Sequence, residues 1–275
     1  MARREQRPTE FYGIPVTATK YGVLQDAIRS QHCPYLGTRC DKSRKGDRTQ
    51  TIGSCSVDYQ GGSLIVCPHR LLENDQVFLN AVPLLRPRCR YVVVPEIAMP
   101  GGSVDFFVVA MDGSSIVDYV GLETQALDTT GTGGVWDARN DLLAGKLAKT
   151  YGYGINWKMS AKTILMQMHH KGPSFSVLRR KLVLAVQTEF FKYIGKEFRS
   201  KHVRSAMPTD PVHFHLYDFV SIDGGRRIVL TDRKSTDVAG IEEMLKLGER
   251  PEITEAEVLE RIEAKLPDAK ALSIL

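Results

Sequence analysis

The sequence predicts an α/β fold, a mixed β-sheet flanked by helices, and three groups of residues carry this prediction. Residues 103–110 and 116–126 are rich in β-forming side chains, and the turn-forming stretch 111–115 joins them as a hairpin. Residues 182–186 are a short, wholly apolar run, which is typical of a strand in the centre of a sheet. The turn signal within 214–230 indicates a second hairpin farther along the chain.

Helical patterns surround these strands. We expect helices over residues 21–30, 71–80, 137–151, 160–170, 189–198, 241–247 and 254–265. Thr254 with Glu257 three residues later predicts a capping box at the start of the last helix. The sequence Lys171-Gly172-Pro173 predicts the end of the helix that precedes it.

The chain is expected to divide into three parts. Residues 1–70 form an N-terminal region with a cysteine metal site, residues 71–240 form the α/β core, and residues 241–275 form C-terminal helices. Within the core, strand 90–97 contains Pro95, which should end this strand or confine it to an edge of the sheet.

Length and composition set broad limits. The 275 residues, 43% of them hydrophobic, are enough for one large domain or two modest ones with a real core. No apolar stretch is long enough for a membrane span, and the basic start of the chain leads into no signal segment. We therefore expect a soluble, cytoplasmic protein without a membrane partner.

Positive charge is concentrated in one segment. Residues 158–204 contain eleven Lys or Arg against two acidic residues, whereas residues 241–275 contain five against nine. This asymmetry is typical of a protein with one side that faces a polyanion such as nucleic acid. An ordinary solvated face is the alternative that charge alone leaves open.

Four of the five cysteines lie close together in the sequence and are potential metal ligands: Cys33, Cys40, Cys55 and Cys67. Without a secretory signal a disulfide framework is not expected, so the cluster predicts a structural site with four thiolates around iron or zinc. The usual C-x2-C knuckle is missing. Four separately buried thiols are the alternative, and His69 or Cys89 can replace one ligand.

Two acidic residues of the predicted hairpin face each other. With the turn centred near Ser114, Asp105 lies opposite Glu123, because each is nine residues away. Like charges opposed on an apolar hairpin repel, and a divalent cation is the simplest remedy. Gln125 lies on the same side of the strand as Glu123, and Glu96, one short loop before the Asp105 strand, is a third acidic group. Unrelated surface carboxylates are the alternative.

Several motifs, taken in order, resemble the NotI family of type II restriction endonucleases. They are Cys33-Pro34-Tyr35-Leu36, Cys40 with Lys42, Cys55, Cys67-Pro68-His69-Arg70, Pro95-Glu96, Ser103-Val104-Asp105 and Glu123-Thr124-Gln125-Ala126. The resemblance runs from about Gln31 to Thr130 and continues more weakly through the basic segment. An aspartate followed by Glu-x-Gln is also the order found in PD-(D/E)XK nucleases, with Gln125 where lysine is commoner.

This resemblance implies a PD-(D/E)XK core in a compact, prokaryotic, homodimeric member of the family with a four-cysteine iron site. It also implies Mg²⁺-dependent cleavage of double-stranded DNA at GC-rich palindromes such as CGGCCG or GCGGCCGC. On this basis Asp105 and Glu123 resemble the metal-binding carboxylates. Gln125 takes the place of the lysine, and Glu96 resembles an additional acidic active-site residue.

Two basic clusters are candidate DNA contacts, since arginine reaching guanine O6 and N7 is the commonest way to read GC-rich DNA. They are Lys42, Arg44, Lys45 and Arg48 beside the cysteines, and Arg179, Arg180 and Lys181 in the basic segment. Which of them reads bases stays open.

Two other functions stay open as well. One is a DNA-binding regulator without enzymatic activity, in which the hairpin carboxylates are surface groups. The other is a nucleotide-dependent enzyme built on the glycine-rich turn 131–134, although this turn lacks the G-x-G-x-x-G pattern. His213 and His215 share a strand face, and we favour a structural role for them over a metal site.

Overall fold

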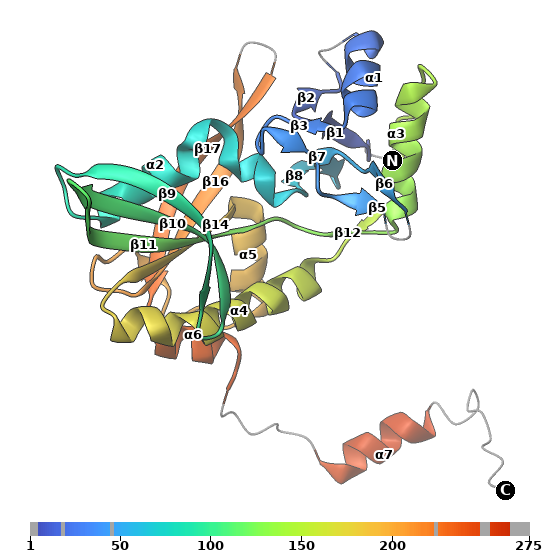
Figure 1. Cartoon of the computed structure of the whole chain (residues 1–275). Coiled ribbons are helices and arrows are strands. Elements are labelled where there is room, and N and C mark those ends of the chain that lie inside the picture. The colour runs from blue at the N-terminus through green and yellow to red at the C-terminus, as the bar shows by residue number, and fades with distance from the viewer. Residues whose placement is uncertain (1–4, 18–19, 45–46, 223–224, 248–253, 265–275) are drawn as a thin grey trace, which may run out of the picture. The chain divides into compact units, whose positions relative to one another are not determined.

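The computed structural model describes residues 5–17, 20–44, 47–222, 225–247 and 254–264 (Figure 1). Residues Met1–Leu245 form one compact unit, and Lys246–Leu275 form a second. The second unit contains α7 (Glu255–Glu263), which begins with the predicted capping box: Thr254 N and Oγ1 donate to Glu257 at 2.8 and 3.0 Å. None of the described helices is long and apolar enough to cross a membrane.

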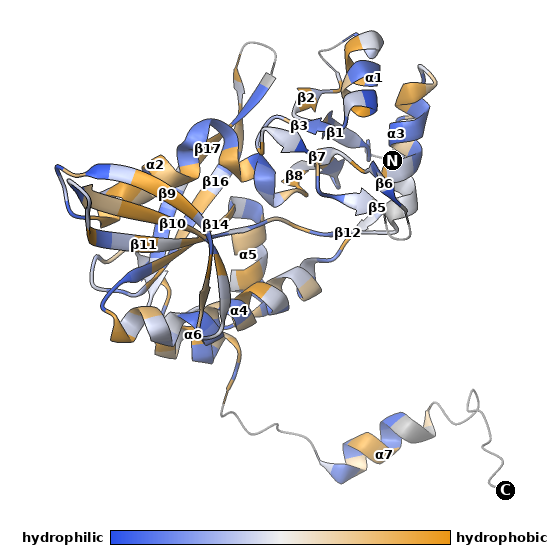
Figure 2. Cartoon of the chain, in the orientation of Figure 1, coloured by the Kyte–Doolittle hydropathy of each residue, from blue (hydrophilic) through white to orange (hydrophobic). Residues whose placement is uncertain are grey.

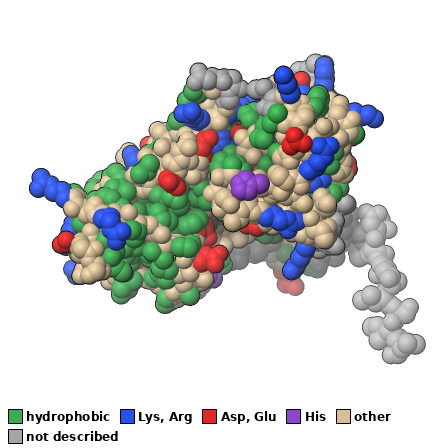
Figure 3. All heavy atoms as spheres, turned by 45° about the horizontal axis from the view of Figure 1, so that its top comes forward, with side chains coloured by type: hydrophobic (Ala, Val, Ile, Leu, Met, Phe, Trp, Pro, Cys, Tyr) green, Lys and Arg blue, Asp and Glu red, His purple; other side chains and the backbone are tan. Residues whose placement is uncertain are grey.

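A seven-stranded mixed sheet forms the centre of the first unit, so the α/β prediction is confirmed (Figure 1). Its strands follow the order β15 (Arg204–Ser205), β17 (Gly225–Thr236), β16 (Val212–Ile222), β14 (Lys181–Gln187), β11 (Ser115–Gln125), β10 (Gly102–Asp112) and β9 (Arg90–Met99). Strands β11, β14 and β16 run parallel, and the strands outside them are antiparallel. The edge position of β9 confirms the prediction from Pro95, and Val93, Val94 and Ile97 of this strand are exposed. Figure 3 shows that hydrophobic side chains gather on one part of the surface.

Helices cover both faces of this sheet, because its central strand is apolar on both sides (Figure 2). Leu182 and Leu184 of β14 pack in one cluster with residues of α4 and α5, and Val183 packs in the other with η1 and α2. The helical elements of the core are η1 (Pro68–Asp75, 3₁₀), α2 (Gln76–Ala81), η2 (Val82–Leu84, 3₁₀), α4 (Trp157–Val177), α5 (Thr188–Glu197) and α6 (Val238–Met244).

A second sheet of four strands is formed by the N-terminal part of the chain, in the order β2 (Ile14–Pro15), β1 (Pro8–Phe11), β7 (Ser54–Tyr59) and β8 (Gly62–Ile65). The elements around it are α1 (Tyr21–Ser30), β3 (His32–Cys33), β4 (Thr38–Arg39), β5 (Ser43–Arg44), β6 (Asp47–Thr51), β12 (Thr129–Thr130), α3 (Thr132–Leu143) and β13 (Gly154–Ile155). Gln187 at the end of β14 joins the two sheets. Its Oε1 accepts from Ile65 N at 2.8 Å, and its Nε2 donates to Ser63 O at 2.7 Å.

The expected helix over 71–80 is wrong in one respect, because the chain leaves the helical conformation at Glu73 and Asn74. The carboxylate of Glu73 pairs with Arg70 at 2.9 Å and accepts a hydrogen bond from Ile228 N at 2.9 Å. The contact with Ile228 of β17 holds Glu73 outside the helical conformation, so a 3₁₀ helix and the short α2 form instead of one helix.

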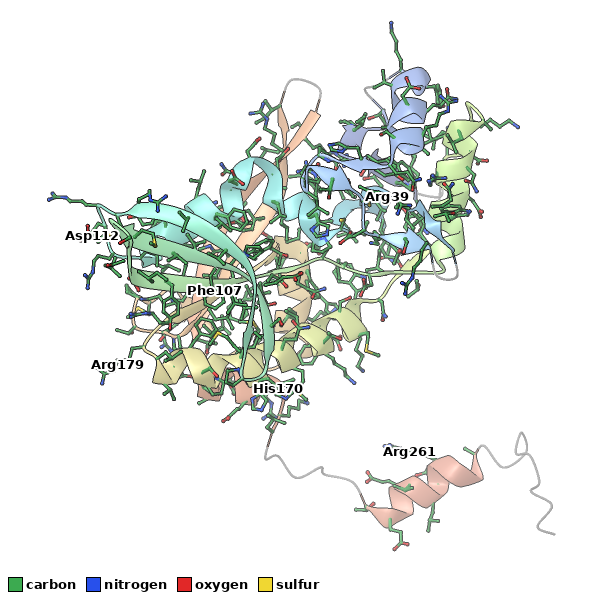
Figure 4. All side chains as sticks on the ribbon, viewed as in Figure 1. Arg39, Phe107, Asp112, His170, Arg179 and Arg261 are labelled. Carbon is green, nitrogen blue, oxygen red and sulfur yellow. The ribbon has the colours of Figure 1, made fainter. Side chains whose placement is uncertain are left out.

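The expected end of α4 at Lys171-Gly172-Pro173 is also wrong, since the helix continues through Pro173 to Val177. Phe175 is fully buried and stacks on Phe107 of β10, with 6.0 Å between the ring centroids (Figure 4 labels Phe107). Gly121 of β11 leaves the space for this ring, because a Cβ there would lie 2.4 Å from it. Burial of the phenyl ring therefore outweighs the hydrogen bond that proline removes from the helix.

Candidate active site

The β10–β11 hairpin has the register that the sequence predicts. Phe106 pairs with Leu122 and Phe107 with Gly121, and a bulge after Ala110 adjusts the ladder near the turn. In this register Asp105 and Glu123 are the next two residues beyond the last pair. At this point the Asp105 side chain, instead of a backbone carbonyl, accepts the strand hydrogen bond. Its Oδ2 accepts from Thr124 N at 2.9 Å and from Thr124 Oγ1 at 3.2 Å.

Glu123 is buried and forms an ion pair with a lysine of helix α4. The Lys171 Nζ lies 2.6 Å from Glu123 Oε1, and the two side chains are 5% and 3% exposed. The pKa of Glu123 is raised to about 7, first by burial and then by the nearby charge of Asp105, whereas Lys171 acts in the opposite direction. Two acids and one ammonium group therefore share this end of the hairpin.

Glu96 and Gln125 border the same region without joining the ion pair. Glu96 lies across from Asp105 on β9, between the pairs Ile97–Val104 and Pro95–Phe106, and its side chain is exposed. Its backbone is left-handed, with φ 48°, which is uncommon for a residue with a side chain and often found at functional sites. The Gln125 Nε2 donates to Ala126 O at 2.6 Å.

A pocket of about 300 Å³ opens beside the end of β11. It is lined by Thr124, Gln125, Ala126 and Asp128 from the core, and by Asp41, Lys42, Val66, Cys67, Pro68 and His69 from the N-terminal part. Lys42 Nζ donates to Val66 O in its wall, and His69 Nε2 lies 2.9 Å from Asp41 Oδ2. The structure thus places Gln125 beside Lys42, one of the predicted DNA contacts.

The four predicted metal ligands are all buried free thiols that come from four separate segments: Cys33, Cys40, Cys55 and Cys67. Burial raises the pKa of Cys67 to about 11, and it also raises the pKa of Cys40 and Cys55. The charges of neighbouring thiols contribute to these upward pKa shifts. Among the described residues, no group of three or more His, Cys, Asp or Glu side chains has a metal-binding arrangement.

The second basic cluster lies away from the carboxylates. Arg180 pairs with Asp118 at 3.4 Å, and Asp118 precedes Glu123 by five residues of β11, which is about 16 Å along a strand. Arg179 and Lys181 line another pocket with Pro208 and Thr209, among others. In Figure 4, Arg179 lies on the side of the hairpin tip that carries Asp112, far from Arg39 of the N-terminal part.

The remaining predicted contacts are only partly placed. Arg48 is exposed on β6. Lys45 and the side chain of Arg44 lie outside the described residues, as do Asp223 and Gly224 of the second hairpin turn.

His213 and His215 are buried in β16, which favours the structural role. Burial lowers the pKa of His215 to about 3 and also lowers that of His213. His213 Nε2 lies 3.0 Å from Asp210 O, and neither ring nitrogen of His215 has a hydrogen-bond partner. Burial therefore keeps both imidazole rings neutral in the core.

Lys171 and Thr124 contact the two acids, a role that was predicted for neither residue. Lys171 shares a face of α4 with Ile164, Met168 and Phe175, all of which are fully buried. A lysine in a row of apolar residues at helical spacing needs a buried acidic partner, so this pattern was the available signal. Thr124 offers no comparable signal, because its role depends on its backbone N–H.

Comparison with models of known protein families gave no match, and comparison with curated proteins gave none either.

Proposed function

We propose that this protein is a type II restriction endonuclease with a PD-(D/E)XK core, which cleaves GC-rich palindromic double-stranded DNA. The observation that carries the proposal is the convergence of Asp105, Glu123 and Lys171 at the end of β10 and β11. Two adjacent carboxylates with a cationic neighbour are a common arrangement for metal-assisted hydrolysis of phosphodiesters. The mixed sheet, with an antiparallel hairpin followed by a parallel strand, supports the same class.

The donor set suits Mg²⁺, because this ion prefers carboxylate oxygens, and the raised pKa of Glu123 indicates that the acids need more positive charge than Lys171 supplies. Asp105 and Glu123 would hold the ion, which supplies Lewis acidity next to the scissile phosphate when bound. Thr124 holds the Asp105 carboxylate in place. Gln125 is an amide and cannot act as a base, so it would orient water or phosphate, and Glu96 is the exposed carboxylate available for a proton.

The surface beside the pocket supports binding of DNA by the N-terminal part. Lys42 and Gln125 line one pocket, so a phosphate group at the carboxylates would lie near the basic residues that follow Cys40. A homodimer would match a palindromic site, with each subunit cutting one strand. In this proposal Arg179, Arg180 and Lys181 contact the DNA backbone at a distance from the cut, which adds affinity without sequence choice.

The thiol cluster would stabilise this N-terminal part by holding iron or zinc. Cys33, Cys40, Cys55 and Cys67 suit such an ion in donor chemistry and in burial, and the proposal requires their sulfurs to draw together around it. Gly13 N also donates to Cys55 Sγ at 3.4 Å, an interaction that supports the charge of a thiolate. A site of four protein ligands is structural and takes no part in the reaction.

The test is a digest of plasmids with and without GC-rich palindromes, in Mg²⁺ and in chelator. We expect discrete fragments only with Mg²⁺ and a palindrome, and a rate about a thousandfold lower for Asp105→Asn. Asp112→Asn at the exposed hairpin turn is the matched control and should cut normally. A gel shift without fragments would favour the DNA-binding regulator, and normal cutting by Asp105→Asn would remove the assigned site.

A further inference from the structure

Lys171 is the buried cation of the site, although it comes from a helix and lies 48 residues from its partner Glu123. Its Nζ makes a 2.6 Å contact with Glu123 Oε1, and its side chain is 5% exposed. Gln125, at the position where the nuclease pattern commonly has lysine, carries no charge. The only ammonium group that pairs with either acid in the described part of the chain is therefore the one from α4.

The turn between β9 and β10 keeps this lysine in place. Gly101 has φ +94°, and a Cβ on it would lie 2.5 Å from His170 O, so only glycine allows the turn to approach α4 so closely. A Cβ on Gly102 would lie 3.5 Å from Lys171 Cε. The aliphatic part of the lysine is thus covered by the turn that leads into the Asp105 strand, and its ammonium group is directed at the acids.

We propose that Lys171 is the counterion of Asp105 and Glu123 in the metal-free protein, that a divalent cation displaces its ammonium from Glu123, and that the released ammonium binds a non-bridging oxygen of the scissile phosphate. The Lys171 ammonium lies 2.6 Å from Glu123 Oε1, an oxygen that a metal ion at these two acids would also use. A metal ion on the same carboxylate competes with the ammonium for that oxygen. Once displaced, the ammonium stays within the length of its side chain of the site, where a phosphodiester supplies the negative charge that it has lost.

The last step rests on the proposed nuclease function, whereas the displacement of the lysine does not. A lysine that only stabilises the fold would contribute to stability and leave both metal affinity and cleavage unchanged. Displacement predicts opposite changes in the two quantities, which separates it from a structural role.

The experiment uses four full-length proteins: the natural chain, Lys171→Met, Lys171→Gln and, as a matched control, Lys162→Met. Lys162 is an exposed lysine of the same helix. Mn²⁺ affinity is measured by calorimetry without DNA, and cleavage of a palindrome-containing duplex is measured in single turnovers at saturating Mg²⁺. Lys171→Met should bind Mn²⁺ at least about tenfold more tightly, because a unit positive charge beside Glu123 is gone. It should cleave about a hundredfold more slowly, because the phosphate loses an ammonium group.

Lys162→Met should match the natural chain in both measurements. Unchanged or weaker Mn²⁺ binding by Lys171→Met overturns the displacement, and normal cleavage overturns the phosphate contact. Should Lys171→Met not fold, Lys171→Gln carries the same two measurements, because its amide can still donate to Glu123. If the natural chain cuts no DNA, the nuclease proposal and the phosphate contact fail together, while the Mn²⁺ titration still decides the displacement.

Discussion

Two regions of the first unit gather possible metal ligands, and they maintain opposite charge states. At the end of the hairpin, Glu123 is buried beside Asp105 and is paired with Lys171. In the thiol cluster, burial raises the pKa of Cys40, Cys55 and Cys67, so these groups stay protonated near neutral pH.

The difference follows from the ordinary pKa values of the two groups. A carboxyl group ionises well below pH 7 unless its pKa is shifted far upward, so a buried pair of acids is stabilised by a cation near neutral pH. A thiol is neutral at pH 7 without any shift and needs a cation only when it loses its proton. The fold therefore supplies a counterion for the carboxylates, whereas the thiols stay neutral and need no counterion until they bind a metal ion.

The largest expected effect concerns the thiol cluster. We expect the purified protein to contain about one equivalent of iron or zinc, and Cys55→Ala to lose most of it together with about 5 kcal/mol of unfolding free energy. Cys55 is the best test because its thiol is deeply buried and its Sγ accepts from Gly13 N. Elemental analysis and urea unfolding provide the two readouts.

Cys89→Ala is the control for this prediction, since the Cys89 thiol donates to Pro87 O at the start of β9. It should retain its metal. Metal content below about a tenth of an equivalent in the natural chain, with all five thiols open to titration after unfolding, would show that the four clustered cysteines are separate core residues.

The next effect concerns the carboxylate site. Glu123→Ala leaves the Lys171 ammonium buried without its partner, so we expect a loss of about 3 kcal/mol in unfolding free energy in the absence of metal. In Glu123→Ala combined with Lys171→Met, the unpaired charge is gone, and much of this loss should be recovered. Urea unfolding of the metal-free proteins measures both.

An exposed ion pair supplies the control. Glu189 lies 3.6 Å from Lys192, with side chains 57% and 68% exposed, so Glu189→Ala should cost less than about 1 kcal/mol. Equal losses for Glu123→Ala and Glu189→Ala would mean that the Glu123–Lys171 pair is solvated in solution. The carboxylate site would then have no buried counterion to compare with the thiol cluster.

Several strands of the central sheet were predictable, because they depend on local sequence patterns. The two β-forming stretches 103–110 and 116–126, with a turn centred near Ser114, predict the pairing of Phe106 with Leu122, and Pro95 predicts an edge strand. The apolar run 182–186 predicts a central strand, because burial on both faces removes the need for alternation.

The counterion was not predictable in the same way, since it depends on contacts between distant parts of the chain. Lys171-Gly172-Pro173 has the local signature of a helix end, and only the burial of Phe175 against the sheet explains why α4 continues past it. The expected cation was a divalent ion, whereas the fold itself places an ammonium group at Glu123. The apolar residues at helical spacing around Lys171 indicate that it needs a buried acidic partner, but tertiary packing decides which acid that partner is.

His215 tests the rule that a group buried without a counterion stays neutral. Burial lowers its pKa to about 3 from 6.5, so the unfolded chain binds a proton more readily between these values, and the stability contributed by neutral His215 is lost as pH falls through that range. We therefore expect His215→Leu to gain about 2 kcal/mol relative to the natural chain between pH 8 and pH 5. Urea unfolding at both pH values measures this difference.

The control for this prediction is His32→Asn, because His32 is exposed at the start of β3. It should leave the pH dependence of stability unchanged. If His215→Leu follows the natural chain from pH 8 to pH 5, then the imidazole reaches solvent in the folded protein and burial does not control its charge.

The smallest expected effect compares the two basic clusters and so locates the DNA relative to the carboxylates. Lys42 lines the pocket beside Gln125, whereas Arg180 pairs with Asp118 about 16 Å along β11 from Glu123. Both Lys42→Gln and Arg180→Gln should weaken DNA binding a few-fold. Each should also reduce the slope of log DNA affinity against log salt concentration by about 1, as expected for the loss of one phosphate contact. In the proposed nuclease, only Lys42→Gln should also slow single-turnover cleavage of bound DNA, because its charge would lie near the scissile phosphate. Fluorescence anisotropy in Ca²⁺ gives the salt slopes. A cleavage defect confined to Arg180→Gln would place the cut beside the second cluster and contradict the assigned carboxylate site.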